Sequence, residues 1–386
     1  MILESEAPRP LRWGMVGGGK GSQIGGAHRV GAARDSLFEL VAGVFDIDAI
    51  RGRTFGESLG LDASRCYDDY KSMFSDESNR TDGIEVVSIA TPNSTHYQIC
   101  RAALEAGIHV VCEKPITFKS SEAIELQDLA KSKGLILGVM YGYCGYPMVH
   151  QARAMVSRGD IGEVRLVQMQ FAHGYHASEV EEHDPGLKWR VSPEVAGSSY
   201  VLGDIGTHSF YMGSMITGLK VDELLCSRQS FIHSRKPLED NAHVLLRYNN
   251  GAEGTLWASA VNVGSAHGQK IRVVGSLGSI EWWDEHPNQL HYAKIDGPVQ
   301  ILERGMDYLH NEARFDRIGG GHSEGFFESW ANLYRRFYQA IDYSINDNEE
   351  ALVELWYPDA QAGVEGVSFV EKCVESADNH SKWVKF

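Results

Sequence analysis

The sequence lacks the features that mark membrane, nucleic-acid-binding and disulfide-rich proteins. No run of about 18 apolar residues occurs, so we predict no transmembrane helix. Lys and Arg number 36 against 52 Asp and Glu, and the net charge of −16 argues against binding to nucleic acid or to an anionic membrane. The six cysteines include no Cys-x-x-Cys pair, which favours reduced thiols and predicts no metal site. Residues 1–10 contain acidic side chains and no apolar core, so we expect a cytoplasmic protein without a secretory signal.

The length of 386 residues predicts two domains, and the first of them shows an α/β pattern. Short apolar runs alternate there with helical segments such as 96–106. The predicted strands cover 11–16, 38–45, 84–90, 109–112 and 135–141. Because these runs are apolar on both faces, they indicate a parallel sheet covered on both sides by helices. We predict a dinucleotide-binding Rossmann domain over residues 1–145.

The remaining residues, 146–386, follow a different pattern, in which polar and apolar residues alternate. This alternation is found at 164–171, 242–248 and 254–260, and it is typical of antiparallel strands with one solvated face or one face used for subunit contact. The turn residues 249–251 and 275–278 each separate two such segments and predict hairpins. Helices are predicted at 328–345 and 358–377. We therefore expect an α+β second domain.

A glycine-rich stretch follows the first predicted strand directly. It runs from Gly17 through Gly19 to Ile24 and Gly25, where a helix is predicted to begin. Glycines at this place let the backbone approach a pyrophosphate, whose charge the helix N-terminus stabilises. The spacing differs from Gly-x-Gly-x-x-Gly, so a flexible loop is the alternative interpretation of this stretch taken alone.

Asp46, at the end of the second predicted strand, makes the nucleotide interpretation more specific. A carboxylate there accepts hydrogen bonds from the adenosine ribose and repels a 2′-phosphate, which favours NAD over NADP. Two alternatives remain open. Asp46 could merely cap the next helix, and Arg51, one turn later, could reach a phosphate.

Glu113, Lys114 and Pro115 directly follow the fourth predicted strand. Ligands of this architecture bind at the carboxyl edge of the sheet, where the Lys114 ammonium could hydrogen-bond a substrate hydroxyl and stabilise a developing alkoxide. The alternative is an ordinary solvent-facing lysine. Pro115 restricts Lys114 to extended backbone, which favours a defined orientation.

The segments 88–96 and 103–115 resemble the glucose–fructose oxidoreductase/inositol dehydrogenase (Gfo/Idh/MocA) family. The resemblance implies an NAD(P)-binding Rossmann domain, a C-terminal domain with a large, mostly antiparallel open sheet, and hydride transfer at a hydroxyl of a sugar or cyclitol. It also implies that Thr91, Asn93 and His96 border the cofactor. In the same way, it implies that Glu113 lies near the nicotinamide and that Lys114 is catalytic.

Asp204 and His208 are four residues apart in a helix predicted from residue 203 to about 215. Both side chains would share one helix face, and an imidazole is suited to accept a hydroxyl proton. A surface pair is the alternative, but the resemblance implies a catalytic pair acting with Lys114. It further implies that Trp189 and Arg190 approach the nicotinamide and the substrate.

Other candidate residues concern the substrate. His173, Tyr175, His176 and His183 crowd one region, but their spacing fits no metal-ligand set. We include Tyr175 among the substrate-binding residues and assign no metal. Residues 141–147 lack the two arginines common in relatives, which indicates a neutral ring polyol as substrate.

Residues 319–326 resemble a Gly-His-Pro-Glu-Gly segment of a scyllo-inositol/L-glucose dehydrogenase-like branch, with Ser323 where proline is usual. In that branch the equivalent of His322 reaches a neighbouring subunit's pocket. The alternative is a surface loop that caps a helix.

Together these features predict an NAD-dependent dehydrogenase of a cyclic polyol, an inositol or a pyranose, that assembles as a homodimer or tetramer. NADP is the less favoured cofactor. One alternative is a nucleotide-binding regulator that has lost its chemistry. Another is an enzyme of the same family that acts on a dihydrodiol or an N-acetyl sugar glycoside.

Overall fold

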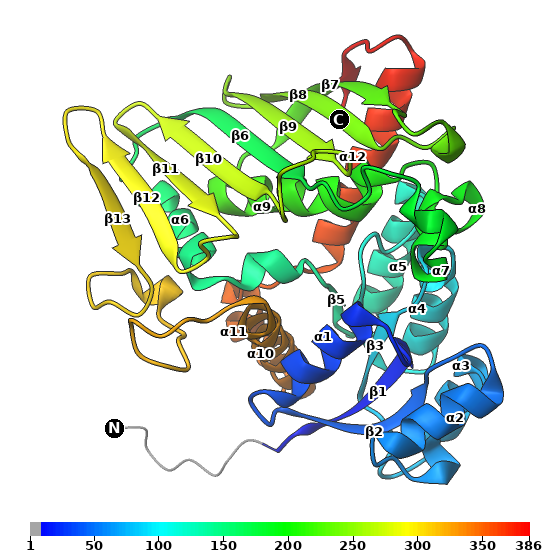
Figure 1. The fold of residues 1–386 in the computed structure, drawn as a ribbon. Helices are drawn as coiled ribbons and strands as arrows, with labels where there is room; N and C mark the ends of the chain where they lie inside the picture. The colour runs from blue at the N-terminus through cyan, green and yellow to red at the C-terminus, as the bar shows by residue number, and fades with distance from the viewer. Residues whose placement is uncertain (1–8) are drawn as a thin grey trace. The chain divides into compact units, whose positions relative to one another are not determined.

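The computed structural model describes residues 9–386, which form two compact units (Figure 1). The first unit comprises residues 9–117, Ser121–Gly142 and Trp330–Gly363. The second comprises Phe118–Ser120, Tyr143–Ser329 and Val364–Phe386. No helix among residues 9–386 is long and apolar enough to cross a membrane.

The first unit is built on a five-stranded sheet in the order β2-β1-β3-β4-β5, with every neighbouring pair parallel. Its strands are β1 (Leu11–Gly17), β2 (Phe38–Val44), β3 (Val86–Ala90), β4 (His109–Cys112) and β5 (Leu137–Val139). Consecutive residues of β3, β4 and β5 are almost all buried, as expected of strands covered on both faces. The chain leaves β1 toward β2 on one side and returns to β3 on the other. A ligand-binding crevice is expected at this point, outside the carboxyl ends of the strands.

Helices connect these strands as the sequence predicts. They are α1 (Gln23–Ala33), α2 (Ala49–Ser58), α3 (Tyr70–Ser78), α4 (His96–Glu105) and α5 (Ser120–Ser132). Three begin at a side chain that accepts a hydrogen bond from the first turn, namely Ser22, Asp48 and Asp69. The α/β Rossmann prediction is confirmed.

The segment Trp330–Gly363 belongs to the first unit, although the sequence analysis expected it in the second domain. It contains most of α10 (Phe326–Ile345) and all of α11 (Glu349–Glu354). The buried Tyr334 hydroxyl lies 2.7 Å from Ser88 Oγ of β3 and 2.6 Å from His28 Nδ1 of α1. Contacts of this kind, between residues about 250 or more positions apart, explain why the segment packs with the Rossmann sheet.

The second unit is built on a nine-stranded sheet in the order β13-β12-β11-β10-β6-β9-β8-β7-β14. The strands on one side of its centre are β10 (Gln269–Gly275), β11 (Gly278–Trp283), β12 (Gln289–Lys294) and β13 (Val299–Glu303). The others are β6 (Val164–Ala172), β7 (Val221–Gln229), β8 (Asn241–Tyr248), β9 (Glu253–Ser259) and β14 (Val384–Lys385). Within this second sheet, β6 and β9 are the one parallel pair among the described strands, so the prediction of a mostly antiparallel sheet is confirmed. Both predicted hairpin turns, 249–251 and 275–278, join antiparallel neighbours.

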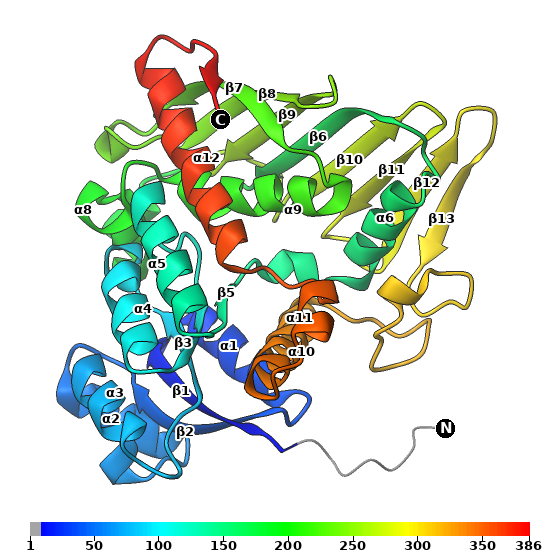
Figure 2. The same cartoon turned by 180° about the vertical axis from the view of Figure 1, so that it is seen from behind.

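Helices cover one face of this second sheet (Figures 1 and 2). The helices assigned to this unit are α6 (Pro147–Ser157), α7 (Pro185–Lys188), α8 (Pro193–Ala196), α9 (Thr207–Thr217) and most of α12 (Ala360–Asp378). Along β8, buried and exposed residues alternate, and the exposed positions are His243, Leu245 and Arg247. The exposed side of β8 therefore presents polar and apolar side chains together.

We expect Tyr334→Phe to lower the free energy of unfolding by about 1–3 kcal/mol, because His28 and Ser88 would each lose a buried hydrogen-bond partner. Urea denaturation measures this loss. Tyr338→Phe on the same helix is the control, since its exposed hydroxyl donates only to the Arg9 carbonyl at 3.0 Å. The control should stay within about 0.5 kcal/mol of the wild type. Equal losses in both variants would contradict the structural role of the buried hydroxyl.

Candidate active site

The glycine turn after β1 is shaped by close backbone contacts. Gly17 and Gly18 have φ values of +82° and +67°, and the Gly18 amide donates to the Ala90 carbonyl at 3.0 Å. A Cβ on Gly25 would lie 2.2 Å from the Gly18 oxygen, so the first turn of α1 can approach the loop only with glycine there. Ser22 caps the helix. This narrow turn before a helix N-terminus suits the diphosphate of a dinucleotide.

Asp46, which the sequence predicts at the adenosine ribose, forms an ion pair with Arg51, which the sequence offers as a possible phosphate contact. The Arg51 Nη2 and Asp46 Oδ1 atoms are 2.8 Å apart, and Asp46 also accepts from the Asp48 amide at 2.9 Å. The hydrogen bond from Arg51 lowers the pKa of Asp46. Asp48, not Asp46, caps α2. The alternative that Asp46 caps the next helix is therefore wrong.

Thr91 and Asn93 follow β3, and His96 is the first residue of α4. Asn93 is buried, and the Thr95 hydroxyl donates to Thr91 Oγ1 at 2.7 Å. His96 is fully buried, with its ring nitrogens 2.7 Å from the Pro115 carbonyl oxygen and 2.8 Å from that of Thr91. Burial lowers the pKa of His96, and the two carbonyl oxygens oppose that shift. His96 therefore ties the ends of β3 and β4 together.

The loop after β4 begins with Glu113 and Lys114. Glu113 is only 8% exposed, and its Oε1 atom lies 3.2 Å from His28 Nε2. His28 contacts the Tyr334 hydroxyl through its other nitrogen, so the carboxylate is held by a buried polar chain from α1 and α10. Lys114 is half-buried at the same sheet edge as the glycine turn. Every candidate residue of the first unit therefore lies near the carboxyl ends of β1 to β4.

Asp204 and His208 lie in the second unit at a change of helix type. Residues Leu202–Gly206 form a π-helical turn that continues as α9, a feature that is frequent at functional sites. The sequence predicts the helix but not this wider turn. His208 is 7% exposed, and its ring packs against Tyr143 at 4.8 Å between centroids.

Arg190 and Trp189 lie beside Asp204. Arg190 Nε is 3.2 Å from Asp204 Oδ2, and its guanidinium covers the Trp189 ring at 4.6 Å from the centroid. Nearby, His176 Nδ1 hydrogen-bonds the Tyr200 hydroxyl. Burial lowers the pKa of His176 and raises that of Tyr200. The second unit therefore holds an anchored carboxylate among buried aromatic and imidazole groups.

Tyr175 is 58% exposed and stacks on His173, whose pKa burial lowers to about 4. His173 is therefore neutral near pH 7. No group of three His, Cys, Asp or Glu residues that could hold a metal ion is found in the part of the chain that the structure describes.

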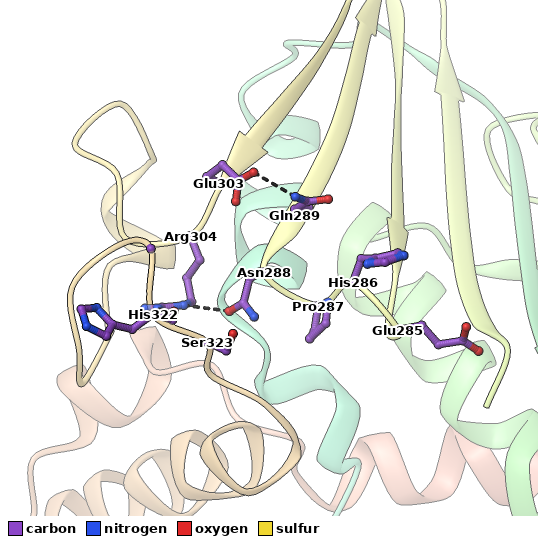
Figure 3. A pocket seen from close by; sticks show the side chains of 10 residues that line it. Glu285, His286, Pro287, Asn288, Gln289, Glu303, Arg304, His322 and Ser323 are labelled. Atoms are coloured by element: carbon purple, nitrogen blue, oxygen red, sulfur yellow. Dashed lines mark hydrogen bonds between the residues drawn. The ribbon is translucent and has the colours of Figure 1, made fainter. Parts of the chain in front are cut away.

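His322 lines a pocket of about 300 Å³ (Figure 3). The residues of this pocket are Glu285, His286, Pro287, Asn288, Gln289, Glu303, Arg304, Gly321, His322 and Ser323. They include neither Asp204 nor His208, so this pocket does not join His322 to the catalytic candidates. Figure 3 shows the exposed imidazole pointing away from Asn288 and Gln289. The buried Arg304 holds the loop by donating to the His322 carbonyl at 2.5 Å.

Several side chains that support these candidates could not be predicted from the sequence. His28 and Tyr334 hold Glu113, while Tyr143 and His267 lie against or near His208. The only sequence signal was the aromatic character of residues 141–147, which includes Tyr143.

Two family models match the chain. One, described as an oxidoreductase family with an NAD-binding Rossmann fold, matches residues 11–141. The other, the C-terminal alpha/beta domain of the same oxidoreductase family, matches residues 153–386. The chain belongs to the Gfo/Idh/MocA oxidoreductase family. The predicted family and dinucleotide domain are thereby confirmed.

Several individual relatives match this family member over nearly its whole length, and a more distant one matches about three quarters of it. An uncharacterized oxidoreductase of Bacillus subtilis is 55% identical and covers 100% of both chains. An inositol dehydrogenase homolog from Azotobacter vinelandii, solved with NAD⁺, is 55% identical with a TM-score of 0.97 over 99% of both chains. A structure of such a homolog from the same organism with NADH and myo-inositol has a TM-score of 0.94 over 98% of both chains. A levoglucosan dehydrogenase of Pseudarthrobacter phenanthrenivorans is 27% identical over 73% of this chain and 76% of its own.

Proposed function

We propose that this oxidoreductase is an NAD-dependent dehydrogenase that oxidises a ring hydroxyl of a cyclic polyol. The observation that carries the proposal is the 55% identity, over nearly the whole chain, to an inositol dehydrogenase homolog solved with NADH and myo-inositol. The narrow glycine turn and Asp46 support NAD as the cofactor. The missing arginines in residues 141–147 support a neutral substrate.

In the proposed reaction, bound NAD would accept a hydride from a ring carbon. Lys114 hydrogen-bonds the reacting oxygen, and its positive charge stabilises the alkoxide as it develops. His208 accepts the hydroxyl proton. Asp204, which Arg190 Nε holds at 3.2 Å, orients the ring by accepting hydrogen bonds from its hydroxyls.

The function is tested by following NADH absorbance with a panel of myo-inositol, scyllo-inositol, L-glucose and levoglucosan. We expect NADH to form with at least one inositol or pyranose. If NADH forms with levoglucosan alone, the substrate class would be the anhydrosugars. No turnover with any polyol, while NAD still binds, would favour the regulator alternative.

We expect Lys114→Ala and His208→Ala each to reduce kcat by roughly 10²–10⁴-fold, the usual contribution of a positioned acid–base group. The Kd for NAD should change little in His208→Ala, since His208 is proposed to act on the substrate. Steady-state kinetics and cofactor titration measure both effects. Lys119→Ala, an exposed lysine five residues from Lys114, is the control and should keep wild-type turnover. Near-wild-type kcat in either test variant would remove that residue from the mechanism.

We expect NAD to be preferred over NADP, and Asp46→Ala to weaken that preference by about 1–3 kcal/mol, the scale of a charged hydrogen bond. The variant would also release Arg51, which the structure pairs with Asp46 at 2.8 Å, to meet a 2′-phosphate. Comparing kcat/KM for the two cofactors measures the change. Asp69→Ala, which removes the cap of α3 and has no contact with Arg51 among the hydrogen bonds of that cap, should reduce stability and leave the preference unaltered. A wild-type preference for NADP would contradict the assignment of Asp46.

We propose that the protein is a homodimer or tetramer in which His322 binds substrate in a neighbouring subunit. His322→Ala should then raise KM for the polyol more than it lowers kcat. Sedimentation tests assembly, and mixed oligomers of His322→Ala with His208→Ala test sharing. Such mixtures should regain sites of normal KM, because one subunit supplies His208 and the other His322. A fully active monomer would exclude a shared site, and an unchanged KM would make His322 a surface residue.

A further inference from the structure

A second carboxylate–imidazole–phenol chain leads to His208 within the second unit. Asp284 follows β11, His267 precedes β10, and Tyr143 lies in the short helix Gly142–Gly145. The Asp284 carboxylate forms an ion pair with His267 Nδ1, and His267 Nε2 is 3.0 Å from the Tyr143 hydroxyl. The Asp284 and His267 side chains are 8% and 27% exposed. The three groups therefore form a continuous and mostly buried polar chain.

His267 joins the other two groups through its two ring nitrogens. Nδ1 contacts the Asp284 carboxylate, and Nε2 lies within hydrogen-bond distance of the Tyr143 hydroxyl.

Backbone contacts hold His267 in this place. Glu285 Oε1 accepts from the backbone amides of His267 at 3.1 Å and Gly268 at 3.0 Å. Asp284 and Glu285 are adjacent, so one turn fixes both the backbone and the ring of His267. The arrangement follows the general pattern in which a carboxylate orients a histidine and the histidine orients the functional group.

Tyr143 transmits this orientation to His208 through its ring. The two rings meet edge to face, with 4.8 Å between centroids and an interplanar angle of 87°. Phe171 packs on the same Tyr143 ring at 5.5 Å and lies 6.2 Å from the His208 ring. Tyr143 and Phe171 together leave the His208 imidazole, which is 7% exposed, little room to rotate.

We propose that Asp284, His267 and Tyr143 are positioning residues that hold the His208 imidazole in its proton-accepting orientation. This inference rests on the proposed function, since it assigns a purpose to the orientation of His208. The three residues touch neither cofactor nor reacting atoms in this proposal, and they act only through His208.

The kinetic test uses Asp284→Asn, His267→Gln and Tyr143→Phe in the full-length protein. Each should lower kcat by about 10- to 100-fold, the range for groups that orient a functional histidine, with KM for NAD unchanged. Because the residues act as one chain, Asp284→Asn combined with Tyr143→Phe should be no worse than the more damaging single variant. His233→Gln, an exposed histidine of the same unit, is the control and should match the wild type. Additive losses, or losses in KM for NAD alone, would overturn the proposal.

An experiment without turnover separates this inference from the proposed function. In protein labelled with ¹³C-histidine, the His208 ring signals are identified by their loss in His208→Asn. Asp284→Asn and His267→Gln should shift or broaden those signals through Tyr143, and His233→Gln should leave them in place. Unchanged His208 signals in folded Asp284→Asn and His267→Gln would overturn the positioning role, even for an enzyme that oxidises polyols. If the His208 signals shift but the protein oxidises no polyol, the positioning of His208 by Asp284 and His267 would stand. Only the proposed reaction would then be rejected.

Discussion

The parallel pairing of β1 with β3 determines where the candidate residues of the first unit lie. Gly17 is in register with Ala90, and the Gly18 amide bonds the Ala90 carbonyl at 3.0 Å. Since β2 and β4 pair in parallel on either side, the loops that carry Asp46 and Lys114 leave from the same edge. Parallel strands place all their carboxyl ends together, so segments nearly a hundred residues apart form one rim. Everything that the first unit could offer a dinucleotide depends on this pairing.

Both units support a candidate residue with the same sequence of chemical groups. In the first, Glu113 contacts His28, which contacts the Tyr334 hydroxyl. In the second, Asp284, His267 and Tyr143 repeat the order of carboxylate, imidazole and phenol. A buried polar group is costly to separate from its partner, so the contacts along each chain oppose rotation of its members. In the first unit, these buried contacts hold Glu113, which is adjacent to Lys114. In the second unit, they hold Tyr143, whose ring packs against His208.

The open sheet of the second unit has a different physical basis. Alternation along β8 gives one face to the core and exposes His243, Leu245 and Arg247 on the other. Helices occupy the core face, and the mixed character of the exposed face is compatible with a partner of similar composition. The proposed sharing of His322 between subunits concerns a loop outside this sheet face, which Arg304 anchors through the His322 carbonyl.

The sequence by itself determined what depends on neighbours along the chain. Periodicity identified the five strands of the first unit, the hairpin turns at 249–251 and 275–278, and the helix that begins near Asp204. Because parallel strands share one carboxyl edge, the same reasoning located Gly17, Asp46 and Lys114 at one rim. The family resemblance added roles for these residues that periodicity alone does not contain.

Only the tertiary structure decided what depends on contacts between distant residues. It assigned Trp330–Gly363 to the first unit and placed both ring nitrogens of His96 against backbone carbonyls. It also joined Tyr143 to His267, 124 positions later, beside His208. Such contacts leave no periodic signal in the sequence, because they arise from packing after the strands and helices have formed. A histidine with a supporting role is therefore indistinguishable, in the sequence, from any other.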